Sequence, residues 1–325
     1  MNREKPLVSV VIASYNHADF LEERLESILG QTYNNLEIII VDDKSSDGSV
    51  EIIRKYLNDK RLVLYENQLN LGWVGTSNIG FSLSSGKYLM FANCDDTCLP
   101  NLIEKLVDYF ETERNLGLVY CKSNLINFQG QIIGDDFQGR EKSFKEFCKG
   151  DVTILSEQFN NFLLHSCVIP NLSAALIRRD IFERLGGFSD DYKICSDWDF
   201  YIRLSRENSV GYIAQPLNSF RQHQNTIRAQ DGEEKVLTEI IQLLLNRQSL
   251  MELNFSKRIR SRYQVSRVFA ETVLKRERFG FDQVTRILKT LVLIDHKTVI
   301  ILPISLVARG FNVVLKFISA GIRGV

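Results

Sequence analysis

Two pairs of aspartates each follow a short apolar run, and this placement is the clearest chemical signal in the sequence. Asp42 and Asp43 follow the run 36–41, and Asp95 and Asp96 follow shortly after the largely apolar run 87–92. Such runs, alternating with amphipathic stretches, are typical of buried parallel strands in βαβ units. Ligands of these sheets bind outside the carboxyl ends of the strands. We therefore expect both pairs to line one pocket.

Four carboxylates in one pocket repel one another and take up protons unless a cation or specific donors balance their charge. A divalent cation that carries a phosphorylated ligand meets this need, because Mg²⁺ binds carboxylate and phosphate oxygens. The two pairs therefore favour a metal site for a phosphorylated ligand.

The elements that position these carboxylates follow from the hydrophobic periodicity. Four strand and helix pairs indicate a doubly wound, mostly parallel half-sheet of an α/β protein. The predicted strands are 7–13, 36–41, 62–65 and a strand that ends at 93, and the predicted helices are 19–29, 50–57, one from after the loop 70–73 to about 84, and the segment after Pro100.

The second half of the chain loses this regular alternation. It contains strand-like pieces at 118–121 and 174–177 and a helical segment at 198–206, which indicates a mixed region that supplies a second substrate pocket. From about Glu233 the chain is helical, with almost no proline or glycine before Gly280. We predict a catalytic domain over 1–232, composed of a nucleotide-binding half (1–116) and an acceptor half (117–232), and a helical C-terminal extension over 233–325.

Composition restricts the partners and the location. The 325 residues include 40 basic and 40 acidic residues, so net charge favours neither nucleic acid nor an acidic partner. Residues 1–6 are polar and the run 7–13 is too short for a signal peptide, which predicts a cytoplasmic location. The six cysteines lack the paired short spacings of a zinc site, so we expect reduced thiols without metal.

Five segments, taken in order, resemble the inverting family 2 glycosyltransferases of the GT-A fold, of the bacterial surface-polysaccharide type. The resemblance covers about residues 6–225 and is specific because all five signals occur in sequence. The segments are 8–16, 40–49, 70–72, 93–96 and 197–199.

The resemblance implies a Rossmann-like, mostly parallel sheet with flanking helices that binds a nucleotide-sugar donor. By this likeness Ala13, Tyr15 and the pair Asp42 and Asp43 hold the nucleotide base. A carboxylate accepts the imide N–H of uracil or thymine, and a tyrosine ring offers a stacking face. The alternative for the aspartate pair is a turn that caps a helix.

The resemblance also implies a metal motif at 93–96. Asp96 is the expected ligand of Mn²⁺ or Mg²⁺, and Asp95 contacts the ribose or the metal. Many relatives have an aspartate where this chain has Asn93, which lowers the local negative charge.

Asp197 matches the general base of the family, which removes the acceptor hydroxyl proton during direct displacement at the anomeric carbon. The alternative is that Asp197 is only the N-cap of the following helix, in which case Asp199 is the competing base. Arg221 and His223 resemble the residues that face the diphosphate and the metal, respectively.

The leading hypothesis is a metal-dependent inverting glycosyltransferase that moves a sugar from a UDP- or dTDP-linked donor to a glycan or lipid-linked acceptor. One alternative is a nucleotidyltransferase that makes a nucleotide sugar, although residues 13–17 lack the glycine that its first loop would need. Another is an inactive nucleotide-binding scaffold, which a loss of metal binding through Asn93 would favour.

The C-terminal tail suggests peripheral contact with an anionic membrane. Residues 256–325 contain 14 basic and 4 acidic residues, and cations interrupt the apolar stretch 299–318 before it reaches a spanning length. We expect a helix that lies on the inner face of the cell membrane. The alternative is that the tail packs on the catalytic domain or on a partner subunit.

Overall fold

A computed structural model of the chain describes residues 5–113, 115–163, 166–169, 171–224 and 226–250, and five isolated positions between 259 and 266. The chain divides into two compact units, Met1–His223 and Gln224–Val325. The candidate site residues all lie in the first unit.

The first half of this unit contains a parallel four-stranded region. The strands lie in the order β3-β2-β1-β4 in the sheet. The chain adds β2 and β3 on one side of β1 and then places β4 on its other side, which is the strand order of a doubly wound fold. The strands are β1 (Val8–Ser14), β2 (Leu36–Asp42), β3 (Leu62–Glu66) and β4 (Tyr88–Phe91). All four predicted strands are confirmed.

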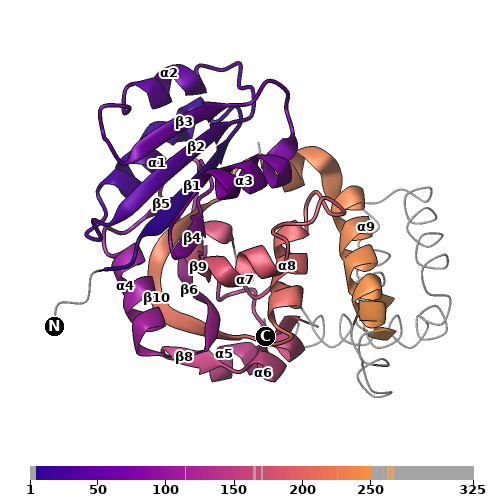
Figure 1. Ribbon diagram of the computed structural model, residues 1–325. Helices are drawn as coiled ribbons and strands as arrows, with labels where there is room; N and C mark the ends of the chain where they lie inside the picture. The colour runs from indigo at the N-terminus through magenta and orange to yellow at the C-terminus, as the bar shows by residue number, and fades with distance from the viewer. Residues whose placement is uncertain are drawn as a thin grey trace, which may run out of the picture. The chain divides into compact units, whose positions relative to one another are not determined.

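Helices cover both faces of this region because successive strand residues point to opposite faces. The residues Val8, Val10 and Ile12 join a buried core with the apolar faces of α1 and α4. On the other face, α3 approaches β1 so closely at Gly80 that a Cβ there would lie 2.3 Å from Val11, and α3 crosses in front of the sheet in Figure 1. The helices are α1 (Ala18–Leu29), α2 (Ser49–Arg54), α3 (Gly72–Leu83) and α4 (Leu102–Thr112).

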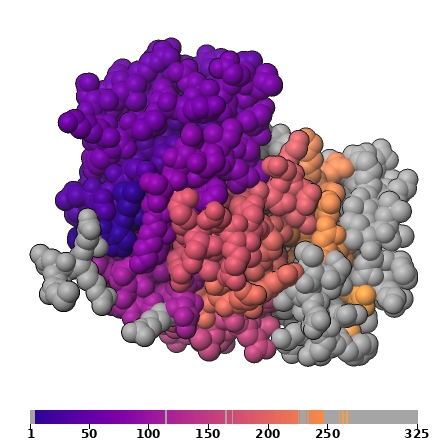
Figure 2. Space-filling view, in the orientation of Figure 1, coloured from indigo at the N-terminus to yellow at the C-terminus, as the bar shows by residue number. Residues whose placement is uncertain are grey.

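The same sheet continues into the second half with mixed strand directions. The order beyond β4 is β9-β6-β10-β5, and β9 runs antiparallel to both β4 and β6. Figure 2 shows the two halves of this unit, purple and pink, packed directly against each other. The strands are β5 (Thr97–Cys98), β6 (Leu116–Ile126), β7 (Ile132–Asp135), β8 (Val152–Ile154), β9 (Ala175–Arg178) and β10 (Ser209–Arg221).

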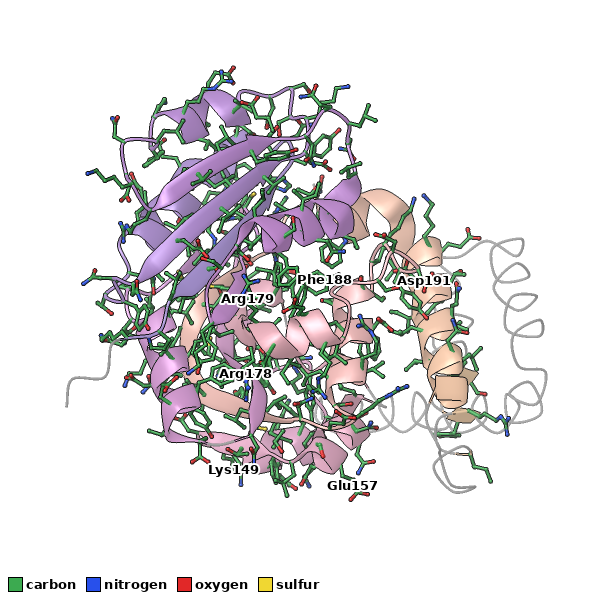
Figure 3. The ribbon with its side chains drawn as sticks, in the orientation of Figure 1. Lys149, Glu157, Arg178, Arg179, Phe188 and Asp191 are labelled. Atoms are coloured by element: carbon green, nitrogen blue, oxygen red, sulfur yellow. The ribbon has the colours of Figure 1, made fainter. Side chains whose placement is uncertain are left out.

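An aromatic cluster supports the helices of the second half. Phe188, labelled in Figure 3, has ring centroids of Phe91, Phe182 and Phe200 within 4.7–5.7 Å. Because Phe200 belongs to α8, the cluster fixes the helix that carries Asp197 and Asp199. The helices are α5 (Lys142–Phe147), α6 (Ser156–Leu163), α7 (Arg179–Arg184) and α8 (Ser196–Leu204), with a short 3₁₀ turn, η1 (Leu172–Ala174).

The second unit contains α9 (Ile227–Leu250), which Gly232 interrupts with a φ of +80°. No helix among the described residues is long and apolar enough to cross a membrane. The tail segment 299–318 lies outside the described residues, so membrane contact stays a prediction.

Candidate active site

Asp95 and His223 form the centre of the site. Asp95 belongs to the loop after β4, and His223 follows β10, which places the two side chains together although 128 positions separate them. The distance from Asp95 Oδ2 to His223 Nε2 is 2.9 Å. Burial on its own would raise the pKa of Asp95, but the hydrogen bond from His223 and the nearby His17 lower it. Asp95 is therefore held as a carboxylate.

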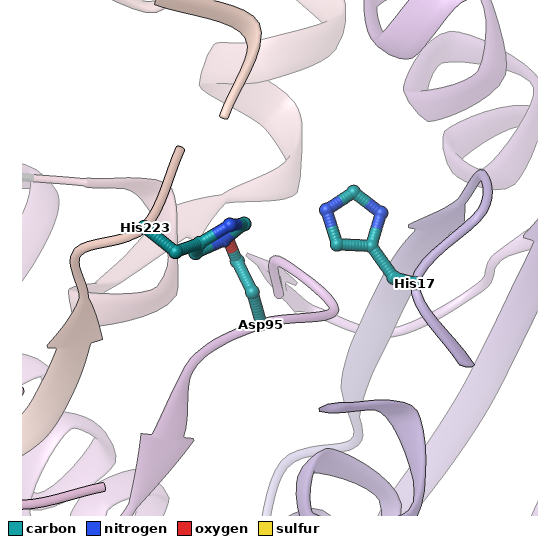
Figure 4. A group of neighbouring side chains, drawn as sticks. All are labelled: His17, Asp95 and His223. Carbon is teal, nitrogen blue, oxygen red and sulfur yellow. The ribbon is translucent and has the colours of Figure 1, made fainter. Parts of the chain in front are cut away.

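A third side chain, His17, completes this group. The ligand atoms of His17, Asp95 and His223 all lie within 4.8 Å of one another, and Figure 4 shows a ring nitrogen of His17 facing the other two side chains. Two nitrogen donors and one carboxylate oxygen at this separation fit one divalent cation, whose neighbouring ligands lie about 3 Å apart in octahedral coordination. The three residues therefore suit a divalent cation.

Asp96, which we expected to be the principal metal ligand, lies outside this group in the structure. It is fully buried, and its Oδ1 accepts the backbone N–H of Arg221 at 3.0 Å. Its Oδ2 accepts the side-chain amides of Asn171 at 2.9 Å and Asn93 at 3.3 Å. Burial and the neighbouring charge of Asp95 raise the pKa of Asp96 to about 7. Asp96 thus holds the segment after β4 that carries Asp95 and Asp96, here called the acidic loop, against β10.

We expect Asp96→Ala to lower the thermal unfolding midpoint by at least ~4 °C, because two buried donors and one part-buried donor lose their acceptor. Differential scanning calorimetry measures this shift. Asp95→Ala is the matched control and should lose much less, since its carboxylate accepts from His223 alone among the contacts described above. An Asp96→Ala protein as stable as the Asp95→Ala protein would refute the structural role.

The guanidinium of Arg221, which we expected to face the diphosphate, bonds to groups of the protein itself. It is 1% exposed, and its Nε donates to the backbone oxygen of Asp95 at 2.7 Å. Its Nη1 donates to the backbone oxygens of Asn127 and Phe128, and its Nη2 pairs with Glu23 at 2.5 Å. Arg221 therefore ties the acidic loop, the β6–β7 hairpin and α1 together, two residues before His223.

Asp42 fulfils the turn role that we held as an alternative. Its Oδ2 accepts the backbone N–H of Ser45 at 2.8 Å and its Oδ1 accepts the Ser45 hydroxyl at 2.6 Å, an Asx turn at the end of β2. Asp42 is buried, and its contact with a nucleotide stays a prediction.

Asp43 organises the start of α3 and keeps capacity for a ligand. Its two oxygens accept the backbone N–H groups of Leu71 and Gly72, both at 2.8 Å, and the side-chain amide of Asn67 at 2.9 Å. A carboxylate has about four acceptor positions, so one is left for an imide N–H. Ala13 lies on β1 and pairs with Val41, two residues before Asp43. Tyr15 lies just beyond β1 and is 45% exposed.

The two candidate bases on α8 differ in their surroundings. Asp199 is buried and pairs with Arg203 at 2.8 Å, and burial raises the pKa of Asp199. Asp197 lies in the first turn and is less buried, and its Oδ1 accepts the N–H of its neighbour Trp198 at 2.7 Å. The N-cap position belongs to Cys195, so the structure does not give Asp197 the capping role.

Two site residues were missed from the sequence. His17 lies three residues beyond the end of β1, and the rule that ligands bind at carboxyl ends of strands offered a signal for it. Arg24 lies on the buried face of α1 and is fully buried. Its charge acts on Asp96, Cys94 and Cys98. The only signal for Arg24 in the sequence was that one charged residue interrupts the apolar stripe of the predicted helix.

The chain is similar to known proteins over most of its length. Residues 9–186 match the model of the family described as Glycosyl transferase family 2. An uncharacterized glycosyltransferase of Methanocaldococcus jannaschii is 32% identical over 67% of this chain and 71% of its own length.

Two solved structures share the fold. S. aureus TarS 1–349 in complex with UDP has a TM-score of 0.64 at 15% identity, covering 94% of this chain and 87% of that one. A mannosyltransferase from Pyrobaculum calidifontis in complex with GDP-Man and Mn²⁺ has a TM-score of 0.56 at 16% identity, and the match covers 95% of this chain and 87% of that one.

Proposed function

Because the chain belongs to glycosyl transferase family 2, we propose that it transfers a sugar from a UDP- or dTDP-linked donor to a hydroxyl of a glycan or lipid-linked acceptor. A divalent cation, Mn²⁺ or Mg²⁺, assists the transfer. The observation that carries this proposal is the pairing of Asp95 with His223 beyond the carboxyl end of β4, at 2.9 Å.

The nucleotide binds across the carboxyl ends of β1 and β2. Asp43 accepts the imide N–H of the base, and the exposed ring of Tyr15 offers a stacking face. Ala13, which has a small side chain, leaves room for the base beside these two. The backbone oxygen of Ala13 accepts the Cys94 thiol at 3.2 Å, which connects this region to the acidic loop.

Asp95 and His223 would hold the cation, with the donor diphosphate as a further ligand. When bound, the cation neutralises the negative charge that builds on the departing nucleoside diphosphate. Arg221 keeps the backbone of Asp95 in place, and Asp96 holds β10 next to the loop. These two buried residues therefore position the ligands and do not bind the donor themselves.

Asp197 acts as the general base. It takes the proton from the acceptor hydroxyl as that oxygen attacks the anomeric carbon, and the bond from this carbon to the diphosphate oxygen breaks. One direct displacement inverts the anomeric carbon and needs no covalent sugar intermediate on the protein.

Asn93, which departs from the aspartate of many relatives, donates its amide to Asp96. An aspartate at this position would bring a second carboxylate against a buried one. Asn93 is thus compatible with a working cation site, and its structural contact gives the inactive-scaffold alternative no support.

Nucleoside diphosphates that differ in one donor group test the base site. We expect UDP and dTDP with Mn²⁺ to raise the thermal unfolding midpoint, because a ligand of the native state stabilises it. CDP has no imide N–H and presents an acceptor to Asp43, so its affinity should be at least ~10-fold weaker. Isothermal titration of each ligand gives the ratio. Equal affinity for CDP and UDP would contradict the role of Asp43, and no binding of any of them would contradict the proposed donor class.

A further inference from the structure

We infer that His17 is a third protein ligand of the cation and that the resulting set of two imidazoles and one carboxylate makes the site prefer Mn²⁺ to Mg²⁺. The inference rests on the proposed function in one respect, namely that a cation binds at Asp95 and His223. It adds a ligand from the opposite side of the site and a metal preference.

The three ligand atoms come from three segments that are distant in the sequence. His17 follows β1, Asp95 follows β4 and His223 follows β10, yet the atoms lie within 4.8 Å of one another. Figure 4 shows a nitrogen of the His17 ring directed toward the other two side chains. The ring centroids of His17 and His223 are 6.1 Å apart, so one cation fits between the rings.

The tautomer of His17 suits a metal ligand. Its Nδ1 lies 2.6 Å from the backbone oxygen of Tyr15, and a carbonyl oxygen only accepts, so Nδ1 carries the proton in the neutral ring. Nε2 then has a lone pair available for a cation. A histidine that donates its other ring N–H to a backbone carbonyl is the usual arrangement around protein-bound metals.

The backbone of His17 is held firmly, which preorganises the ligand. Its carbonyl oxygen accepts the N–H groups of Phe20 at 3.0 Å and Leu21 at 3.1 Å at the start of α1. Its N–H donates to the hydroxyl of Ser49 at 3.3 Å. The imidazole needs no large movement to reach a cation beside Asp95.

The ligand types determine the metal preference. Carboxylate and diphosphate oxygens suit both Mg²⁺ and Mn²⁺. Mg²⁺ prefers oxygen ligands and retains water, so each imidazole nitrogen added to the site disfavours Mg²⁺ relative to a first-row transition metal such as Mn²⁺. Two imidazoles favour Mn²⁺, and diphosphate oxygens remain available to either ion.

The test compares His17→Gln with the native chain in a Mn²⁺ titration followed by electron paramagnetic resonance, with Mg²⁺ as competitor. We expect the variant to bind Mn²⁺ at least ~10-fold more weakly and to lose most of its preference over Mg²⁺. Asp19→Asn is the control, because it removes an exposed charge two residues away that is not in the group. Native-like Mn²⁺ affinity and selectivity in His17→Gln would overturn the inference.

A second measurement does not depend on how the variant folds. Pulsed electron paramagnetic resonance on the native protein with Mn²⁺ and UDP counts coordinated nitrogens, and we expect two imidazoles. One imidazole would reject the two-imidazole set, and its persistence in His17→Gln would reject His17 as the ligand while leaving the proposed function intact. No bound Mn²⁺ under these conditions would contradict the proposed cation dependence itself and His17 with it.

Discussion

Replacing Asp197 with asparagine is expected to lower kcat by at least ~10²-fold while leaving the affinity for UDP and Mn²⁺ unchanged. The amide has nearly the same shape as the carboxylate and still accepts the N–H of Trp198, so α8 keeps its structure. It has no basic oxygen for the acceptor proton. Turnover under saturating donor and titration of UDP separate these two effects.

Asp199→Asn is the matched control on the same helix. The variant weakens the ion pair with Arg203, whose other donors hold the backbone oxygens of Leu185 and Gly187. We expect a loss of stability with little change in kcat per folded molecule. If Asp197→Asn retains native kcat and Asp199→Asn does not, the base is Asp199.

Replacing Asp95 with asparagine is expected to reduce the UDP affinity measured with Mn²⁺ to the level that the native protein shows with excess EDTA. Asp95 supplies the only carboxylate of the three-residue group, and an amide oxygen carries no net charge to balance the cation. The ionised state of Asp95, which His223 and His17 favour, is the one that binds a metal.

Isothermal titration with UDP, in the presence of Mn²⁺ or EDTA, measures this difference. Gln222→Ala is a useful control, because its side chain lies between Arg221 and His223 in the sequence and contacts only the backbone oxygen of Arg221 among the hydrogen bonds described for it. A metal-dependent gain in UDP affinity that survives in Asp95→Asn would refute the ligand assignment.

The parallel half of the fold was predictable because its strands and helices are encoded locally. Each strand is a short apolar run, and each run buries its residues against helices that are adjacent in sequence. The aspartate pairs could be placed at one edge of the sheet from this alternation alone. The α2 helix, however, ends at Arg54 and not at 57, since the weak pattern there left its end undefined.

The individual roles of neighbouring aspartates could not be predicted from position. Asp95 and Asp96 are adjacent in an irregular loop, and the partners that separate them, His223 and Asn171, are more than 70 positions away. The same holds for Arg221, whose burial depends on Glu23 and on the β6–β7 hairpin. Sequence patterns suggest which residue types carry charge, but only the tertiary pairing decides which of them face a ligand.

The mixed half was unreadable for a related reason. Its order of β4, β9, β6 and β10 joins strands that are far apart in the chain, so no local periodicity specifies the pairing. Arg24, on α1 in the parallel half, shows a different limit, because a charged residue within an apolar helical stripe is normally read as a polar interruption. In the structure it is a buried cation near Asp96.

The most direct test of the proposed function is the release of UDP from a panel of UDP-sugars, measured with and without acceptor saccharides or lipid-linked saccharides. We expect at least one donor to give acceptor-stimulated UDP release with Mn²⁺, an inverted anomeric centre in the product, and no release with excess EDTA or in Asp197→Asn. Acceptor-stimulated release that persists undiminished in EDTA, or a product with retained configuration, would contradict the account.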